Sequence, residues 1–161
     1  MTDSHAVGIH AYEVDPRIGS GYPNPFRKQV QSRSKRLLGD AFSLTHYGVN
    51  LVELMPGAWS SQRHWHTHED EFIYVLSGEL TLVTDGGEQL LTAGMVAGFP
   101  AGKANGHHLV NNGDAVASYI EIGDRSAEDE VYYPDIDLQL KREDDGGRVF
   151  THRDGRPYGK G

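Results

Sequence analysis

The sequence predicts an all-β domain, built as a small sandwich or barrel of antiparallel strands. Segments such as Glu79–Thr84 and Ser118–Ile122 alternate polar and apolar residues, which is the period of a strand with one buried face. Turn residues separate such segments at intervals of about eight to twelve residues, and no helical pattern intervenes between them. Asp85–Gly87 lies between two of these segments and predicts a β-hairpin, because glycine readily adopts positive φ angles.

One predicted strand, Phe72–Leu76, is apolar at every position. A strand that is apolar on both faces is buried on both faces, either beneath a second sheet or at a subunit interface. The N-terminal region has little periodicity and does not predict a core of its own. We therefore expect the protein to be a homodimer.

Three regions of the chain differ in composition. Residues 1–40 contain glycine and proline breaks, which favour short strands or an arm that packs on the barrel. Residues 41–123 contain the strand patterns and form the predicted barrel. Residues 124–161 form an acidic C-terminal extension with a basic end, for which we expect a partly irregular course or a short helix and a disordered terminus.

The composition of the chain excludes or disfavours several kinds of partner and chemistry. The formal charge of −8 disfavours nucleic acid and anionic lipid as partners. The absence of cysteine excludes disulfides, thiolate metal sites and cysteine nucleophiles. No segment resembles a secretory signal or a membrane span, so we expect a cytoplasmic protein. The basic segment 27–36 is either a solvated surface or a positive rim that steers an anionic ligand.

The residues that suggest chemistry lie between His64 and Glu71. Residues two apart on a strand point to the same face, so His64 and His66 can direct their imidazoles to one point. Trp65 alternates with them and should face away. Glu71 follows a predicted turn and begins the next strand. Imidazole and carboxylate ligands suit zinc, iron, nickel or manganese, whereas the alternative is an exposed loop with titrating histidines.

The spacing of these residues resembles the first motif of the cupin superfamily, G-x5-H-x-H-x3,4-E-x6-G. The matching residues, with one extra residue before the first histidine, are Gly57, His64, His66, Glu71 and Gly78. The second motif of that family is G-x5-P-x-G-x2-H-x3-N, and its first part is matched by Gly94, Pro100 and Gly102. Asn105 occupies the expected histidine position, but His107 followed by Asn111 restores the H-x3-N spacing two residues later.

The resemblance implies a small antiparallel cupin β-barrel, a double-stranded β-helix of the jelly-roll type. It implies one divalent metal ion per chain, which is Fe, Mn, Ni or Zn. The implied ligands are His64, His66, Glu71 and His107. His107 and His108 are adjacent on a strand-like run, so parity allows only one of them to point inward unless a bulge intervenes. The family spacing selects His107, and His108 should then face outward or line the cavity mouth. Cupins commonly pair as dimers, which agrees with the homodimer expected from Phe72–Leu76.

Cupins include dioxygenases, decarboxylases, isomerases, lyases and non-enzymatic sensors, so the fold does not fix the function. We expect a metal-dependent enzyme that acts on a small carboxylate- or hydroxyl-bearing molecule, with His68 or His108 as a catalytic acid or base. The alternative is a non-catalytic cupin that binds or senses a small molecule. A purely structural module would leave the converging metal-type side chains without a purpose.

Overall fold

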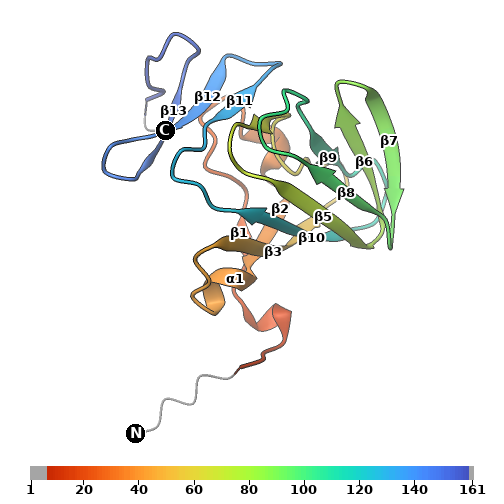
Figure 1. The fold of residues 1–161 in the computed structure, drawn as a ribbon. Coiled ribbons are helices and arrows are strands. Elements are labelled where there is room, and N and C mark those ends of the chain that lie inside the picture. Colours follow the sequence, from red (N-terminus) through yellow and green to blue (C-terminus); the bar gives the residue numbers. More distant parts are fainter. Residues whose placement is uncertain (1–6, 160–161) are drawn as a thin grey trace, which may run out of the picture.

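The computed structural model describes residues 7–159 and consists mainly of β-strands, which confirms the predicted fold class (Figure 1). The strands form three sheets whose pairings are all antiparallel. A six-stranded sheet has the order β1 (Arg17–Ile18), β2 (Arg33–Leu37), β3 (Tyr47–Leu54), β10 (Ala117–Asp124), β5 (Glu71–Ser77) and β8 (Val96–Phe99). A three-stranded sheet contains β7 (Gly87–Thr92), β6 (Glu79–Thr84) and β9 (His108–Val110). A four-stranded sheet contains β13 (Arg148–Thr151), β12 (Leu138–Arg142), β11 (Val131–Tyr133) and β4 (Trp65–His66).

The main hydrophobic core joins the six-stranded sheet to the three-stranded sheet. Ile73 and Val75 of β5 and Tyr119 of β10 point into it from one side. Leu80 and Leu82 of β6 point into it from the other side, with the alternation that the sequence predicts for this strand. Burial of such apolar side chains is the main stabilising contribution to a domain of this kind.

The hairpin predicted at Asp85–Gly87 is confirmed. β6 and β7 pair as far as Thr84 and Gly87, so only Asp85 and Gly86 remain in the loop. Gly87 adopts a φ of 111°, in the region that favours glycine. The two-residue loop sets the register of the whole hairpin.

Gly78 connects β5 to β6, and its conformation explains why a glycine closes the first motif. Its φ is 73°. A Cβ at this position would lie only 2.8 Å from the Cα of Ala117. Any other residue would therefore strain the backbone and collide with β10.

The outer face of β5 differs from the prediction of burial beneath a second sheet. Phe72, Tyr74 and Leu76 are 40%, 43% and 44% exposed, whereas the alternate residues Ile73 and Val75 are buried. The structure thus covers one face of this strand and leaves the other apolar and open to solvent. Of the two alternatives stated for this strand, the sheet cover is wrong and the subunit interface stays a prediction.

The N-terminal and C-terminal segments pack on each other in a second core. Tyr22 and Val30 from the N-terminal segment contact Val131, Tyr133 and Leu138 from the C-terminal sheet. Strands β11, β12 and β13 were not predicted, because each is short and lies among acidic residues and turns. The expectations for residues 1–6 and 160–161, which include the disordered C-terminus, lie outside the described residues.

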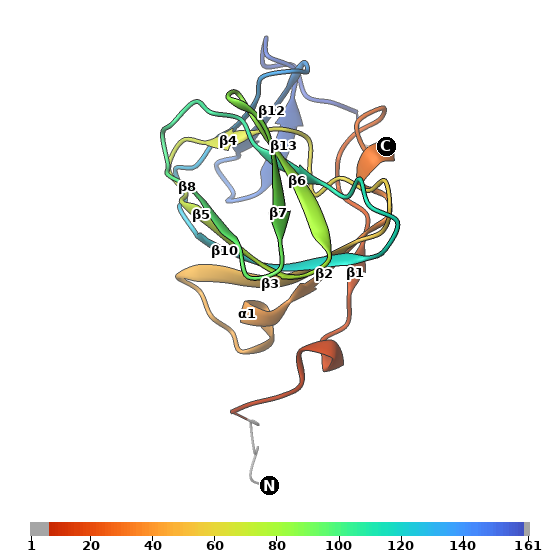
Figure 2. The same cartoon turned by 90° about the vertical axis from the view of Figure 1, so that its right-hand side faces the viewer.

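The helical segments are short, namely η1 (Ala11–Glu13), η2 (Lys28–Val30) and α1 (Leu38–Ala41). Helix α1 lies against β3, on the opposite side of the molecule from the C-terminal sheet (Figure 2). Within residues 7–159, no helix has the length and apolar character that a membrane span requires.

Candidate metal centre

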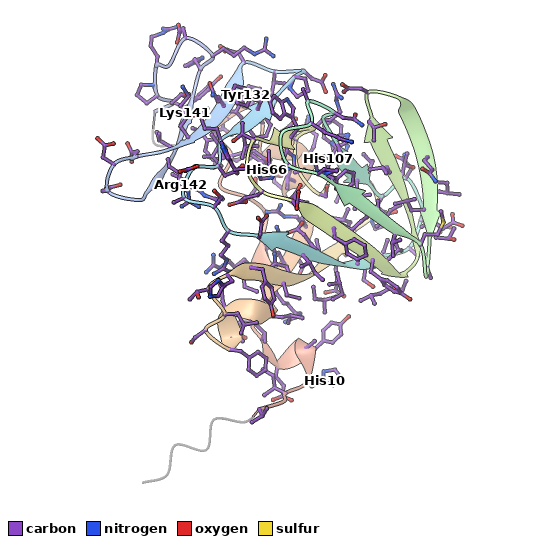
Figure 3. The ribbon with its side chains drawn as sticks, viewed as in Figure 1. His10, His66, His107, Tyr132, Lys141 and Arg142 are labelled. Atoms are coloured by element: carbon purple, nitrogen blue, oxygen red, sulfur yellow. The ribbon has the colours of Figure 1, made fainter. Side chains whose placement is uncertain are left out.

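The four predicted ligands come from three neighbouring segments of the chain. His64 and His107 face each other in an isolated β-bridge, in which each backbone N–H donates to the carbonyl of the other at 3.2 and 2.9 Å. His66 lies in β4, which pairs with β11, and Glu71 is the first residue of β5. Figure 3 shows His66 and His107 in the interior, between the C-terminal sheet and the main body. The fold thus brings all four predicted residues together.

Glu71 lies at the centre of this group. Its Oε2 is 2.6 Å from Nε2 of His107 and 3.5 Å from Nε2 of His64, and its Oε1 is 3.5 Å from Nε2 of His66. One ligand atom from each of His64, His66 and Glu71 lies within 4.8 Å of the others. His107 joins the group through its direct contact with Glu71.

The other ring nitrogen of each histidine has a different environment. Nδ1 of His64 donates to the carbonyl oxygen of Gln62 at 2.8 Å, and Nδ1 of His66 donates to Asp129 at 2.7 Å. These acceptors place the proton on Nδ1 and turn Nε2 toward Glu71, as outer hydrogen bonds do for metal-binding histidines. Nδ1 of His107 is buried and has no hydrogen-bond partner among the described residues.

Glu71 and the three histidines shift one another's pKa values. Burial raises the pKa of Glu71, but hydrogen bonds from the three histidines outweigh burial and hold its pKa well below the usual value. Burial lowers the pKa of His66, but the bonds to Asp129 and Glu71 outweigh it and raise the pKa to about 10. Burial lowers the pKa of His107. The site therefore holds an ionised carboxylate that attracts positive charge.

Two further carboxylates lie behind His66. Asp129 accepts the His66 proton at 2.7 Å and the backbone N–H of His68 at 2.9 Å. Glu69 is buried, lies 3.7 Å from Nδ1 of His66 and accepts the backbone N–H of Ser126 at 3.0 Å. These bonds fix the orientation of the imidazole from the side opposite to Glu71. Asp129 was not predicted, because nothing in the local sequence links it to a residue so distant along the chain as His66.

The candidate ligands His64, His66 and Glu71 line a cavity of about 330 Å³. Its charged and polar lining also includes Arg33, Lys35, Asp40, Asn50, Glu69, Glu121, Asp124, Arg125 and Arg148. A cavity of this size accommodates a small ligand. Two smaller cavities adjoin the site. One of them is lined by Glu121 together with His64, Glu71 and His107.

An ion pair inside the cavity was not anticipated. Nζ of Lys35 lies 2.8 Å from Oε1 of Glu121, and Nδ2 of Asn50 donates to the same oxygen at 3.0 Å. A sequence signal existed for Glu121, because a carboxylate interrupts the apolar pair Ile120 and Ile122 within a strand. The strand period alone could not show which of the two faces lines a cavity.

The basic segment 27–36 divides along strand β2. Arg33 and Lys35 point into the cavity, as alternate residues of a strand do, whereas Arg36 points away and packs over the ring of Tyr12. Arg33 donates to the carbonyl oxygens of Ser60 and Gly19 at 2.6 and 2.7 Å. Arg33 and Lys35 are thus both held by partners within the protein.

The two histidines considered as acids or bases lie in different places. The side chain of His68 is 51% exposed and is not part of the cavity lining. His108 is buried, with Nδ1 at 2.9 Å from the carbonyl oxygen of Ser61 and its ring edge-on to Trp59. His108 lines the small cavity beside His107, and its pKa is lowered by burial. Trp65 stacks on Tyr132 and faces away from the group, as predicted.

The donor set fits a divalent cation. It offers imidazole nitrogens around an ionised carboxylate, and two of the histidines are oriented from behind. Nε2 of His107 and Nε2 of His66 each carry a proton that faces Glu71, and these protons must leave before the two nitrogens can ligate a cation. The cavity leaves one side of the group open to a small molecule.

Comparison with known proteins supports a relationship over nearly the whole chain. A crystal structure of a sugar phosphate isomerase from a cupin superfamily, from Silicibacter pomeroyi, has a TM-score of 0.89 and 43% sequence identity. The match covers 94% of this chain and 96% of that protein. A proposed sugar phosphate isomerase from Acidithiobacillus ferrooxidans has a TM-score of 0.69 and 34% identity, over 74% of this chain and 76% of that one.

A more distant structure agrees in fold alone. The polyketide cyclase from Streptomyces resistomycificus has a TM-score of 0.58 and 19% identity, over 73% of this chain and 78% of that one. No curated protein sequence matches the chain. Residues 50–123 match the family model described as the cupin domain. The chain belongs to the cupin superfamily.

Proposed function

We propose that this chain is a metal-dependent enzyme that isomerises a small phosphorylated sugar. The observation that carries the proposal is the cavity, which joins the candidate ligands His64, His66 and Glu71 to cationic side chains. The relative with 43% identity carries the name sugar phosphate isomerase, and the one with 34% identity is a proposed sugar phosphate isomerase, which supports the same class of substrate.

The cavity has separate features for the two ends of such a substrate. Arg148 is 47% exposed and Arg125 is 40% exposed, and both line the cavity, where guanidinium groups suit a phosphate. Arg125 is already paired with Asp40, and Arg148 lies 3.6 Å from Glu69. Asn50 also lines the cavity and offers its amide oxygen to sugar hydroxyls.

His64, His66, Glu71 and His107 are the residues that would hold the cation. A divalent cation at this position supplies a Lewis acid that polarises neighbouring carbonyl and hydroxyl oxygens. Asp129 keeps the His66 ring in place, and the carbonyl oxygen of Gln62 does the same for His64. An isomerase also needs a group that moves a proton between adjacent carbons.

The test uses the full chain purified without chelator and supplied in turn with Mn²⁺, Fe²⁺, Ni²⁺ and Zn²⁺. Conversion of D-glucose 6-phosphate, D-mannose 6-phosphate, D-ribose 5-phosphate and D-arabinose 5-phosphate is followed by NMR. We expect at least one aldose phosphate to yield its ketose, and the His64→Ala/His66→Ala variant to yield none. Binding of a sugar phosphate without conversion would favour the alternative of a non-catalytic binding protein.

The homodimer belongs to the same proposal. Phe72, Tyr74 and Leu76 on β5 and Ile122 on β10 are exposed on the outer face of the six-stranded sheet. β5 and β10 are adjacent in this sheet, with Phe72 opposite Ile122, so these side chains form one continuous apolar patch. A patch of this kind on a soluble domain marks an interaction surface, and we assign it to a second copy of the chain.

A further inference from the structure

The interior face of the six-stranded sheet holds a partly buried ion pair that the metal group does not use. Lys35 and Glu121 each have side chains that are only 22% exposed, and they meet at 2.8 Å. Asn50 donates to the same carboxylate oxygen, Oε1, at 3.0 Å. The second oxygen of Glu121, Oε2, accepts no hydrogen bond from the described residues, so it is free to receive a proton.

The strand register directs Glu121 toward the metal group. On β10, Glu121 is two residues before Gly123, and Gly123 is the partner of Glu71 on β5. Residues two apart share a face, so the carboxylates of Glu121 and Glu71 lie diagonally on one face of the sheet. Both line the large cavity, and both also line the small cavity beside His107.

An ion pair of this kind is weak evidence for a stabilising role. Removing two charges from water is costly, and the mutual attraction of the charges repays that cost only in part. The neighbouring positions on this face, Val52 and Ile73, show that the sheet accepts apolar side chains there. A second polar group nearby also lacks a partner: the buried hydroxyl of Tyr119 lines the small cavity and has no hydrogen bond among the described residues.

We infer that Glu121 is the catalytic residue that carries the proton between the two reacting carbons, and that Lys35 and Asn50 position it. The inference rests on the proposed sugar phosphate isomerisation. Oε2 of Glu121 takes the proton from C2 of the aldose, and the electron pair of that C–H bond forms the C1–C2 double bond of an enediol. The carbonyl π pair moves to O1, which takes a proton from a water molecule. The C1–C2 π pair then takes the proton back from Glu121 at C1. The O2–H bond pair forms the C2=O2 bond of the ketose, and the O2 proton passes to water, which balances the proton that O1 took.

The experiment compares Glu121→Gln with Glu53→Gln in the complete, metal-supplied protein. Glu53 lies on β3, is hydrogen-bonded to Tyr12 at 3.1 Å and is not part of the cavity lining, so it is a matched control. The four aldose phosphates named above are incubated in deuterated water, and NMR records ketose formation and deuterium at C1 and C2. Metal content and the thermal melt are measured for each variant.

We expect Glu121→Gln to lower kcat and deuterium exchange by about 10²–10⁴-fold, which is the usual contribution of a general acid–base group. Its metal content and KM should stay near those of the wild type, and Glu53→Gln should match the wild type throughout. If Glu121→Gln retains kcat within about tenfold of the wild type, the catalytic role is wrong. A wild-type protein that converts none of the sugars overturns the proposed function and this role together.

Two further variants, Glu121→Asp and Lys35→Met, test the same role independently. If Glu121→Gln does not fold, Glu121→Asp keeps the charge and withdraws the carboxylate by one carbon. A loss of about 10²-fold in kcat would support the role, because a misplacement of about 1 Å has that effect, and an unchanged kcat would overturn it. Lys35→Met removes the positioning partner and should lower kcat more than it raises KM, whereas a purely structural ion pair predicts a lower melting temperature with kcat unchanged.

Discussion

Asp129→Asn is the most informative single change at the metal centre, because Asp129 touches the candidate ligand His66 without being one of the predicted ligands. The substitution keeps the shape of the side chain and removes its charge. The Asp129 side chain is 1% exposed and accepts Nδ1–H of His66 at 2.7 Å. Water cannot readily take the place of so buried a carboxylate, so the loss of its charge and of its hydrogen bond to His66 should not be compensated.

The expected magnitude follows from these contacts. A hydrogen bond to a charged group is worth about 1.5–3 kcal/mol, and loss of the outer partner of a ligating histidine costs about 10–100-fold in metal affinity. Asp129 also favours the proton that competes for His66, because it helps to raise the His66 pKa to about 10. A cation with two charges gains more from the carboxylate than a proton does. We expect the Kd for Zn²⁺ to rise about tenfold at pH 7. At pH 9 the Kd should rise by a larger factor, because fewer protons compete with the metal for His66.

The assay is competition for Zn²⁺ against a chromophoric chelator, with the thermal melt as a control for folding. Asp137→Asn is the matched variant: Asp137 binds Nδ1 of His152 at the same distance of 2.7 Å and accepts the backbone N–H of Arg153 at 2.8 Å, outside the cavity. It should leave the Kd unchanged. An Asp129→Asn protein with the wild-type Kd would refute the assignment of His66 as a ligand oriented from behind.

Three further predictions concern stability, the fourth ligand and assembly. In protein freed of metal by a chelator, the pKa of His66 is raised from 6.5 to about 10, so protonated His66 stabilises the folded state. This contribution is complete below about pH 6.5 and is lost as the pH rises toward 10. Urea melts should show a loss of at most about 1.4 kcal/mol per pH unit between pH 7 and 9, and His66→Gln should lack it. His107→Ala should weaken Zn²⁺ binding far more than His108→Ala, and the reverse order would move the ligand by one residue. Sedimentation should give a dimer that Tyr74→Asp converts to monomer, and a monomeric wild type at micromolar concentration would contradict the proposed interface.

Local patterns were sufficient to predict the main body of the fold. The alternation in Glu79–Thr84 and the Asp85–Gly87 turn gave the hairpin, because both depend only on neighbouring residues. The spacing of His64, His66 and Glu71 was equally informative, since parity along a strand and one short turn bring these side chains together. His107 is distant in sequence, and only the resemblance to the cupin motifs pointed to it.

The contacts between distant segments could not be predicted in this way. Asp129 reaches His66 from the segment before β11, and the C-terminal sheet completes the environment of β4. Lys35 meets Glu121 because β2, β3 and β10 lie side by side, a strand order that the sequence alone does not give. Phe72–Leu76 was expected either beneath a second sheet or at a subunit interface, because the composition of a strand does not distinguish these two kinds of cover.

The measurement that tests the central claim most directly is the metal content of the protein purified without chelators. Plasma mass spectrometry is applied to the wild type and to His64→Ala/His66→Ala, with circular dichroism as the check on folding. The account predicts about one divalent ion per chain in the wild type and almost none in a folded double variant. A double variant that keeps the wild-type metal content would contradict the assignment of this site.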